Sequence, residues 1–202
     1  RYKDLVPTRQ IWDWLEMNFP QRHDSYTVVI SPLIGGSHNT HNFVDKDQNY
    51  SEIIMFISSP GILDKYHITS NKVVEGLMSR MVFTEIDHNY VNPTTNQNSN
   101  FEQVVEVFSD LKKWNKQTGY SRPILTFNEY MTWGVFGLYA YDTYQDEDYK
   151  EIMEYTVALM NRRGFVKFKE FYNELLRLYK NRQDGQKAYE LYPTILEFAT
   201  TL

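Results

Sequence analysis

Glu85 and His88 are the residues of this sequence whose types and spacing suggest chemistry most directly. They stand three positions apart in the segment Phe83 to Pro93 (FTEIDHNYVNP), at the end of a pattern that predicts a helix. A helix turns by about 100° per residue, so side chains three apart lie within about 60° of each other. A carboxylate and an imidazole on one helix face can act as a general base and as a metal ligand.

The segment is similar to the HExxH motif of zinc peptidases, with one change. In that motif two histidines four apart bind zinc, and the glutamate after the first histidine activates the zinc-bound water. Here Glu85 takes the position of the base and His88 that of the second ligand, but Thr84 replaces the first histidine. A neutral hydroxyl is a poor zinc ligand. The alternative is a partly buried His88 that hydrogen-bonds a carbonyl, with Glu85 in solvent.

Glu129 is a carboxylate within the very apolar segment Ile124 to Tyr144 (ILTFNEYMTWGVFGLYAYDTY). A buried carboxylate is costly unless it is paired or bound to something. In the gluzincin class of zinc peptidases, an Asn-Glu pair on a later helix supplies the third zinc ligand through its glutamate, and Asn128-Glu129 matches that pair. The alternative is a salt bridge or hydrogen bond from Glu129 to an arginine or a tyrosine.

A glycine-rich stretch containing two histidines, Gly35 to His41 (GGSHNTH), precedes the predicted strand at Tyr50. In gluzincins an edge strand before the metal helix holds the peptide substrate by main-chain pairing. His38 or His41 could therefore replace the missing ligand or donate to a tetrahedral oxyanion; the alternative is that both are ordinary loop histidines. The substrate cleft is predicted to include Gly35, Gly36, Ser37, His38 and Tyr130.

Taken together, FTEIDHNYVNP and the later NEYMTWGVF resemble a bacterial zincin-like family of unknown function with the motif HE-F-x-H-x-x-x-NP. The resemblance spans roughly Tyr26 to Tyr144, and Thr84 departs from the family pattern. It implies a gluzincin-type metallopeptidase fold, zinc as cofactor and a secreted, periplasmic or cell-envelope location. It also implies Glu85 as the catalytic base and His88 and Glu129 as metal ligands, completed by Glu85 itself, His38 or His41.

The order of the predicted elements indicates an α+β fold, with a small N-terminal β-sheet followed by a mostly helical part. We expect one zincin-like domain over 1–202, with the sheet and the motif helix in 1–92 and the helices that carry Glu129 in 93–202. Strands are predicted at 26–30 and 50–58, and a polar loop at 93–100. Helices are predicted at 7–17, 70–90 (with Ser70 as N-cap and ended by Pro93), 101–114, 124–144, 146–163, 165–180 and 186–200.

Composition excludes several classes of function. The chain of 202 residues has a net charge of −5 and no stripe of basic residues, which argues against a nucleic-acid surface. The absence of cysteine excludes disulfides and thiolate sites, and no apolar run approaches the ~20 residues that span a membrane. With 16 Tyr, 12 Phe and 4 Trp, the chain can build aromatic faces that bind peptides or sugars.

The sequence thus leaves open whether the chain is an enzyme. The first hypothesis is a zinc-dependent peptide hydrolase, of low or lost activity because Thr84 replaces a ligand. The second is a non-enzymatic pseudo-peptidase that binds a peptide, a glycan or a protein partner through an aromatic-rich cleft. A third, a di-iron or manganese site built on E-x-x-H, lacks the second such motif that it requires.

Overall fold

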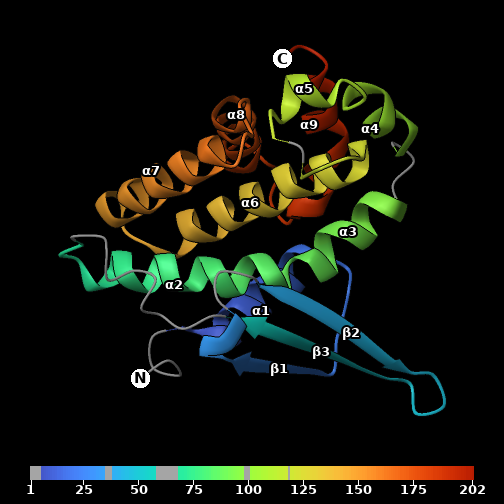
Figure 1. Ribbon diagram of the computed structural model, residues 1–202, viewed down its shortest axis with the longest axis vertical. Coiled ribbons are helices and arrows are strands. Elements are labelled where there is room, and N and C mark those ends of the chain that lie inside the picture. Colours follow the sequence, from blue (N-terminus) through green and yellow to red (C-terminus); the bar gives the residue numbers. More distant parts are fainter. Residues whose placement is uncertain (1–5, 35–37, 58–67, 98–100, 118) are drawn as a thin grey trace. The chain divides into compact units, whose positions relative to one another are not determined.

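The computed structural model describes residues 6–34, 38–57, 68–97, 101–117 and 119–202 (Figure 1). The chain divides into two compact units, unit 1 from Arg1 to Tyr90 and unit 2 from Val91 to Leu202. The predicted α+β class is confirmed, because a small sheet near the N-terminus precedes a mostly helical part. The boundary between the units falls within helix α3.

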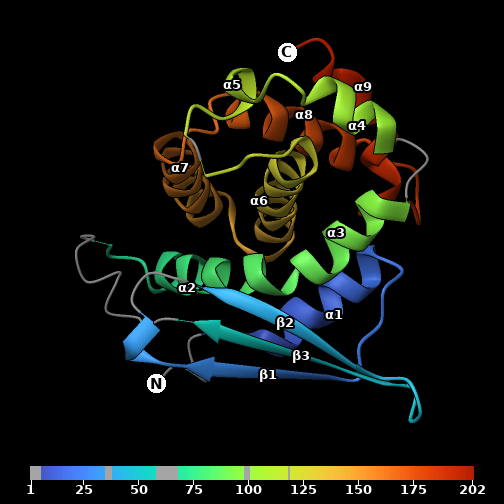
Figure 2. The ribbon, with the colours of Figure 1, turned by 45° about the vertical axis from the view of Figure 1, so that its right-hand side comes forward.

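Unit 1 is built on a three-stranded sheet with the order β1-β3-β2. Strand β3 is central, pairing with β1 in parallel and with β2 antiparallel. Helices α1 and α2 lie on the same face of this sheet (Figure 2). The described elements of this part of the chain are α1 (Thr8–Asn18), β1 (Ser25–Ile30), the 3-10 helix η1 (Pro32–Ile34), β2 (Asn39–Asp45), β3 (Tyr50–Ile57), α2 (Asn71–Ile86) and α3 (His88–Gln97).

The alternation of side chains along β3 separates the two faces of the sheet. Ile53, Met55 and Ile57 are buried on the face that α2 covers, whereas Ile54 and Phe56 are only half-buried on the other face. We call these the helix face and the outer face. Because successive strand residues point to opposite sides, the register with β3 assigns every residue of β1 and β2 to one face or the other.

Strand β2 was not predicted from the sequence. Its residues (NTHNFVD) were interpreted as a loop because they are mostly polar and lack a run of β-branched side chains. The structure shows an edge strand in which Thr40 is half-buried and the other six residues are exposed. Pairing with β3, rather than local propensity, therefore determines the conformation of β2.

The turn that joins β2 to β3 depends on two polar residues. The Asp45 Oδ1 atom accepts hydrogen bonds from the backbone N–H groups of Asp47 at 3.0 Å and Gln48 at 3.2 Å. Asn49 has a φ of 49°, in the left-handed region that asparagine tolerates better than most residues. Both features are typical of tight turns, and they fix the end of the hairpin.

Replacing Asn49 tests this turn. We expect Asn49→Ala to lower the free energy of unfolding by about 1 kcal/mol, because a Cβ without a polar partner is unfavourable at positive φ. Asn49→Gly is the matched control and should be close to neutral, since glycine adopts this conformation freely. Urea unfolding of the three proteins measures the difference. Equal stability of the Ala and Gly variants would contradict the role given to the backbone here.

The motif helix differs from its prediction at the C-terminal end. Its start is confirmed, because the Ser70 hydroxyl accepts hydrogen bonds from the N–H groups of Lys72 and Val73. The expectation that Pro93 ends the helix is wrong: α2 ends at Ile86, Asp87 is its C-cap, and α3 continues through Pro93 to Gln97. Proline removes one N–H bond and the following residues stay helical, so the predicted polar loop at 93–100 is also wrong over 93–97.

Unit 2 consists of helices. Those described are α4 (Phe101–Val107), α5 (Leu111–Trp114), α6 (Pro123–Thr143), α7 (Asp146–Arg162), α8 (Phe168–Lys180), the 3-10 helix η3 (Ala188–Leu191) and α9 (Tyr192–Ala199). The single helix predicted at 101–114 is instead the pair α4 and α5. None of the described helices is long and apolar enough to cross a membrane.

Helix α6 is the core of unit 2, as its apolar sequence predicts. Most of its side chains are buried, and it contacts α4, α5, α7 and α8. Gly137 allows close packing, because a Cβ at this position would collide with the Tyr172 ring of α8. The Tyr172 hydroxyl instead donates a hydrogen bond to the Gly137 carbonyl at 3.2 Å. The same buried helix carries Glu129.

Candidate functional site

The Thr84 side chain forms a hydrogen bond within its own helix. It is 5% exposed, and its Oγ1 atom donates a hydrogen bond to the Arg80 carbonyl at 3.0 Å. A serine or threonine inside a helix commonly bonds the carbonyl four residues before it. Thr84 therefore behaves as a structural residue of α2 and does not substitute for the histidine of a zinc motif.

Glu85 and His88 lie on either side of the junction between α2 and α3. Both are half-buried, and the fully buried Asp87 separates the two helices. The next residue, Asn89, donates hydrogen bonds from Nδ2 to the Ile86 carbonyl at 3.1 Å and to Thr40 Oγ1 of β2 at 3.3 Å. This side chain ties the junction to the edge strand of the sheet.

The register of β2 separates its histidine from that junction. Thr40 pairs with the buried Met55 and so lies on the helix face, whereas His41 pairs with Ile54 and lies on the outer face. The His41 ring accordingly contacts the rings of Phe43 and Phe56, with centroids 6.3 Å and 6.2 Å away. His41 and the Asn89–Thr40 contact therefore belong to opposite faces of the sheet.

His38 precedes β2 and is half-buried, and burial lowers the pKa of its imidazole. A lowered pKa favours the neutral ring, the form that binds metal ions. The other predicted cleft residues of this stretch, Gly35, Gly36 and Ser37, lie outside the described residues.

Glu129 has a partner of the kind that the sequence offered as an alternative to metal. Its Oε2 atom lies 2.8 Å from Arg163 Nη2, and the two side chains are 12% and 29% exposed. The same oxygen accepts a hydrogen bond from the Trp133 indole N–H at 3.2 Å. The Arg163 guanidinium lies over the Trp133 ring, 4.9 Å from its centroid. Metal ligation by Glu129 stays a prediction.

The Glu129–Arg163 pair extends to Tyr120, whose hydroxyl accepts a hydrogen bond from Arg163 Nη2. Burial and then the nearby Glu129 carboxylate raise the pKa of Tyr120 to about 12, although the Arg163 charge opposes them. The tyrosine therefore stays protonated at neutral pH. These charged and aromatic groups form one connected polar cluster within unit 2.

Tyr130 requires a correction, because it was placed in the substrate cleft. Its side chain is fully buried, and its hydroxyl donates to the Trp114 carbonyl at 2.7 Å and accepts from the Lys167 N–H at 3.2 Å. Its ring packs against several aromatic rings of unit 2, including that of Phe108. An aromatic side chain with these contacts stabilises the core and is not accessible to a substrate.

The described residues do not provide the set of ligands that the implied zinc site requires. Among the described residues, no group of three or more histidine, aspartate and glutamate side chains could hold a metal ion. The Thr84 hydroxyl is engaged with Arg80, and Glu129 is engaged with Arg163. The residues that the structure describes therefore do not fit a catalytic zinc centre, which needs three protein ligands.

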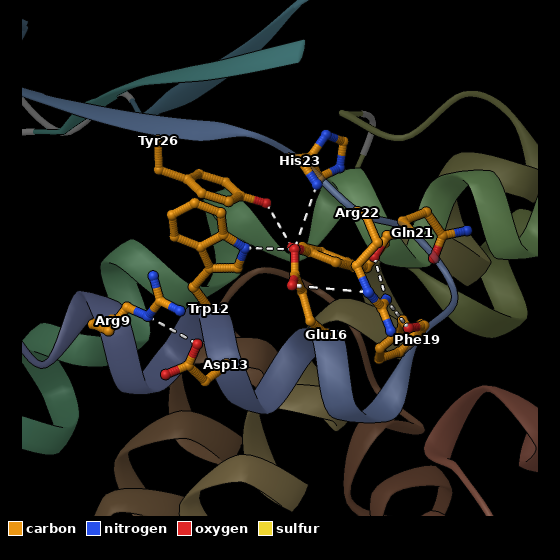
Figure 3. A network of polar contacts seen from close by, with 10 residues as sticks. Arg9, Trp12, Asp13, Glu16, Phe19, Gln21, Arg22, His23 and Tyr26 are labelled. Atoms are coloured by element: carbon orange, nitrogen blue, oxygen red, sulfur yellow. Dashed lines mark hydrogen bonds and ion pairs between the residues drawn. The ribbon is translucent and has the colours of Figure 1, made fainter. Parts of the chain in front are cut away.

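A polar network that the sequence did not predict surrounds Glu16 of α1 (Figure 3). The Trp12 indole N–H donates to Glu16 Oε1 at 2.6 Å, and Arg22 Nε lies 3.9 Å from Glu16 Oε2. The Tyr26 ring meets the Trp12 ring edge-on at 4.5 Å, and its hydroxyl donates to Tyr90 Oη at 2.8 Å. The spacing of Trp12 and Glu16, four apart on an amphipathic helix, was the only signal of this network in the sequence.

His23 joins this network to the sheet. Its Nδ1 atom lies 3.4 Å from Ser51 Oγ, and burial lowers the pKa of the imidazole despite the opposing effects of the Asn89 backbone and of Glu16. The neutral ring is therefore the form that fits this position. The segment that contains His23 was interpreted only as a polar break between α1 and β1.

Comparisons with known proteins do not add to this description. Set against protein-family models, curated proteins and solved structures, the chain matches none of them. The zincin-like resemblance therefore stays a prediction that rests on the short motifs in the sequence.

The Glu129–Arg163 ion pair predicts a strong effect of removing one partner. We expect Glu129→Gln or Arg163→Met to lower the unfolding free energy of unit 2 by about 2 kcal/mol, because each leaves a largely buried polar group poorly paired. The double variant should lose less than the sum of the single variants. Urea unfolding followed by tryptophan fluorescence measures these values. As a control, Glu75→Gln removes the more exposed pair with Lys72 and should change stability little. Strict additivity in the Glu129–Arg163 cycle would contradict the pairing.

The lowered pKa of His23 predicts how stability depends on pH. Above pH 6.5, the ordinary pKa of histidine, the ring is neutral in both the folded and the unfolded chain. Below it the unfolded chain binds a proton that the folded chain resists, so stability is lost as the pH falls, by at most about 1.4 kcal/mol per pH unit. Unfolding measured from pH 7.5 to 5 should show a shallower loss in His23→Gln than in the wild type. An unchanged slope would contradict the effect of burial on His23.

Proposed function

We propose that this chain binds an extended peptide by adding it as a fourth strand at the free edge of β2, without hydrolysing it. The observation that carries the proposal is the character of that edge. Strand β2 is seven residues long and pairs with β3 alone among the described strands. An added peptide would use the main-chain N–H and C=O groups of its other edge.

In the part of the chain that the structure describes, the edge of β2 has few of the features by which proteins usually block strand addition. Such edges carry lysine or proline, are very short, or bulge away. The sequence NTHNFVD contains neither lysine nor proline, and its Phe43 and Val44 side chains are 55% and 60% exposed. The opposite edge strand β1 is less open, because four of its six residues are half-buried. These properties favour β2 as the strand that receives a partner.

The position of the α2–α3 junction also supports a peptide at β2. The hydrogen bond from Asn89 to Thr40 holds the junction beside the edge strand, on the helix face. A bound strand would place alternate side chains on that face and the others on the outer face, near Phe43. Glu85 and His88 flank Asn89 and could contact the first of these two sets.

Binding without hydrolysis is favoured over zinc catalysis because two side chains of the implied zinc site already have protein partners. The Thr84 hydroxyl donates to Arg80 of its own helix, and the Glu129 carboxylate is neutralised by Arg163. A catalytic zinc would need new partners for both arginine and threonine, at a cost in stability. Binding of a peptide at the edge of β2, beside the α2–α3 junction, leaves the partners of Thr84 and Arg163 unchanged.

Backbone methylation of a bound peptide tests strand addition. We would select a ligand from a display library of eight-residue peptides and methylate its backbone nitrogens one at a time. Only alternate N–H groups of an added strand face its neighbour, so methylation should weaken binding about tenfold at every second position and little between. Affinities come from fluorescence anisotropy. Sensitivity without this alternation, or a library that yields no ligand, would refute the proposal.

The same ligand distinguishes binding from catalysis. We expect the purified chain to leave the peptide intact after incubation with zinc, as judged by mass spectrometry, and Glu85→Gln to bind it as the wild type does. Stoichiometric zinc by elemental analysis, together with cleavage that Glu85→Gln abolishes, would instead identify a peptide hydrolase.

A further inference from the structure

A polar cavity of about 460 Å³ lies in unit 1, at the end of the sheet formed by the β2–β3 turn. Its walls come from three parts of the chain: Glu16 of α1, the segment 22–24 that leads into β1, and the hairpin turn with the adjoining ends of β2 and β3. The volume lies within the range of small-molecule sites. The lining residues that bear on its ligand are Arg22, Asp24, Lys46, Asn49, Tyr50 and Ser51.

The charges in the cavity are arranged by the sheet register. Asp24 directly precedes Ser25 of β1, and its Oδ2 atom accepts the Ser51 N–H at 2.7 Å and lies 3.4 Å from Ser51 Oγ. Lys46 directly follows β2, at the opposite edge of the sheet. One strand separates these two edges, so the backbones that carry the carboxylate and the ammonium group are about 10 Å apart.

Arg22, Glu16 and Asp45 are the other charged residues that line the cavity. Arg22 is paired with Glu16 and also donates from Nη1 to the Phe19 and Gln21 carbonyls, at 2.8 Å and 2.6 Å. Within the described part of the chain, Lys46 forms no ion pair, and no cation lies within ion-pair distance of Asp24. Asp45, next to Lys46, also lines the cavity, and its Oδ1 atom accepts the turn N–H groups of Asp47 and Gln48. Lys46 and Asp24 therefore stand at opposite edges of the sheet, and neither forms an ion pair with a described residue.

We propose that this cavity binds a short zwitterionic peptide of two or three residues, with its ammonium group at Asp24 and its carboxylate at Lys46. An extended chain spans about 3.5 Å per residue, so two or three residues cover the distance between the two charges once the Lys46 side chain reaches inward. Asn49 offers an amide to the peptide group.

This site is separate from the edge proposed for strand addition. Strand addition uses the main chain of β2 and needs a longer extended segment. The cavity instead recognises the charged amino and carboxyl termini of a small ligand. Each proposal can fail without the other, because eight-residue ligands test the edge and capped tripeptides test the cavity.

Isothermal titration calorimetry with trialanine tests the proposal. We expect the free zwitterion to bind, and N-acetylation or C-amidation each to weaken binding about tenfold, since each removes one charge-assisted hydrogen bond. Asp24→Asn should also weaken binding about tenfold while still accepting the Ser51 N–H. N-acetylation should then cost nothing further in Asp24→Asn, and C-amidation nothing further in Lys46→Gln.

Two exposed charges of unit 2 provide matched controls. Asp184→Asn and Lys116→Gln should bind trialanine as the wild type does, and thermal unfolding checks that all four variants are folded. Failure of every free peptide of two or three residues to bind overturns the proposal. So does equal binding of capped and free trialanine, or weakening by N-acetylation that persists in full in Asp24→Asn.

Discussion

Burial of Ile53, Met55 and Ile57 under the helices of unit 1 is the constraint on which the rest of this structure depends. These three side chains fix which face of β3 is covered, and β3 lies between the other two strands. A shift of one residue would move all three into solvent, so the register is strongly specified. That register places Thr40 beside Asn89, His41 on the outer face, and Asp24 beside Ser51. Both proposed binding sites follow from it.

The two units differ in how their charged groups are paired. In unit 2 the carboxylate of Glu129 is paired with Arg163 and accepts the Trp133 indole N–H, and Arg163 also donates to Tyr120, so the polar cluster is satisfied internally. In unit 1 the network around Glu16 leads through His23 to a cavity in which opposite charges are still unpaired. A satisfied cluster stabilises a fold, whereas unpaired charges in a cavity are available to a ligand. This contrast is why we assign binding to unit 1.

Where local sequence determines structure, prediction from the sequence succeeded. The β-branched runs of β1 and β3, the Ser70 cap and the apolar helix α6 are examples, and together they give the correct fold class. Prediction failed where contacts with residues far along the chain determine the local structure. Strand β2 forms because β3 offers it a pairing edge, and Pro93 is tolerated inside α3 although proline favours helix ends.

The candidate site was predicted only in part, because its contacts also join residues that are distant in the sequence. Glu129 was correctly recognised as needing a partner, and Arg163 was among the types of partner considered. Its identity could not be predicted, because the two residues are brought together by the packing of α6 with the end of α7. Tyr130 was misplaced because an aromatic ring beside a candidate ligand suggests a cleft as readily as a core. The only sign of the Glu16 network in the sequence was the spacing of Trp12 and Glu16.

Hydrogen–deuterium exchange of the β2 backbone, with and without a selected peptide, tests most directly whether this edge is a binding surface. The amides of Asn39–Asp45 that do not bond β3 face away from the sheet and should exchange quickly in the free chain. Strand addition predicts that the peptide slows those amides alone, at every second residue of β2. If the peptide binds but leaves their exchange unchanged, β2 is not the binding edge.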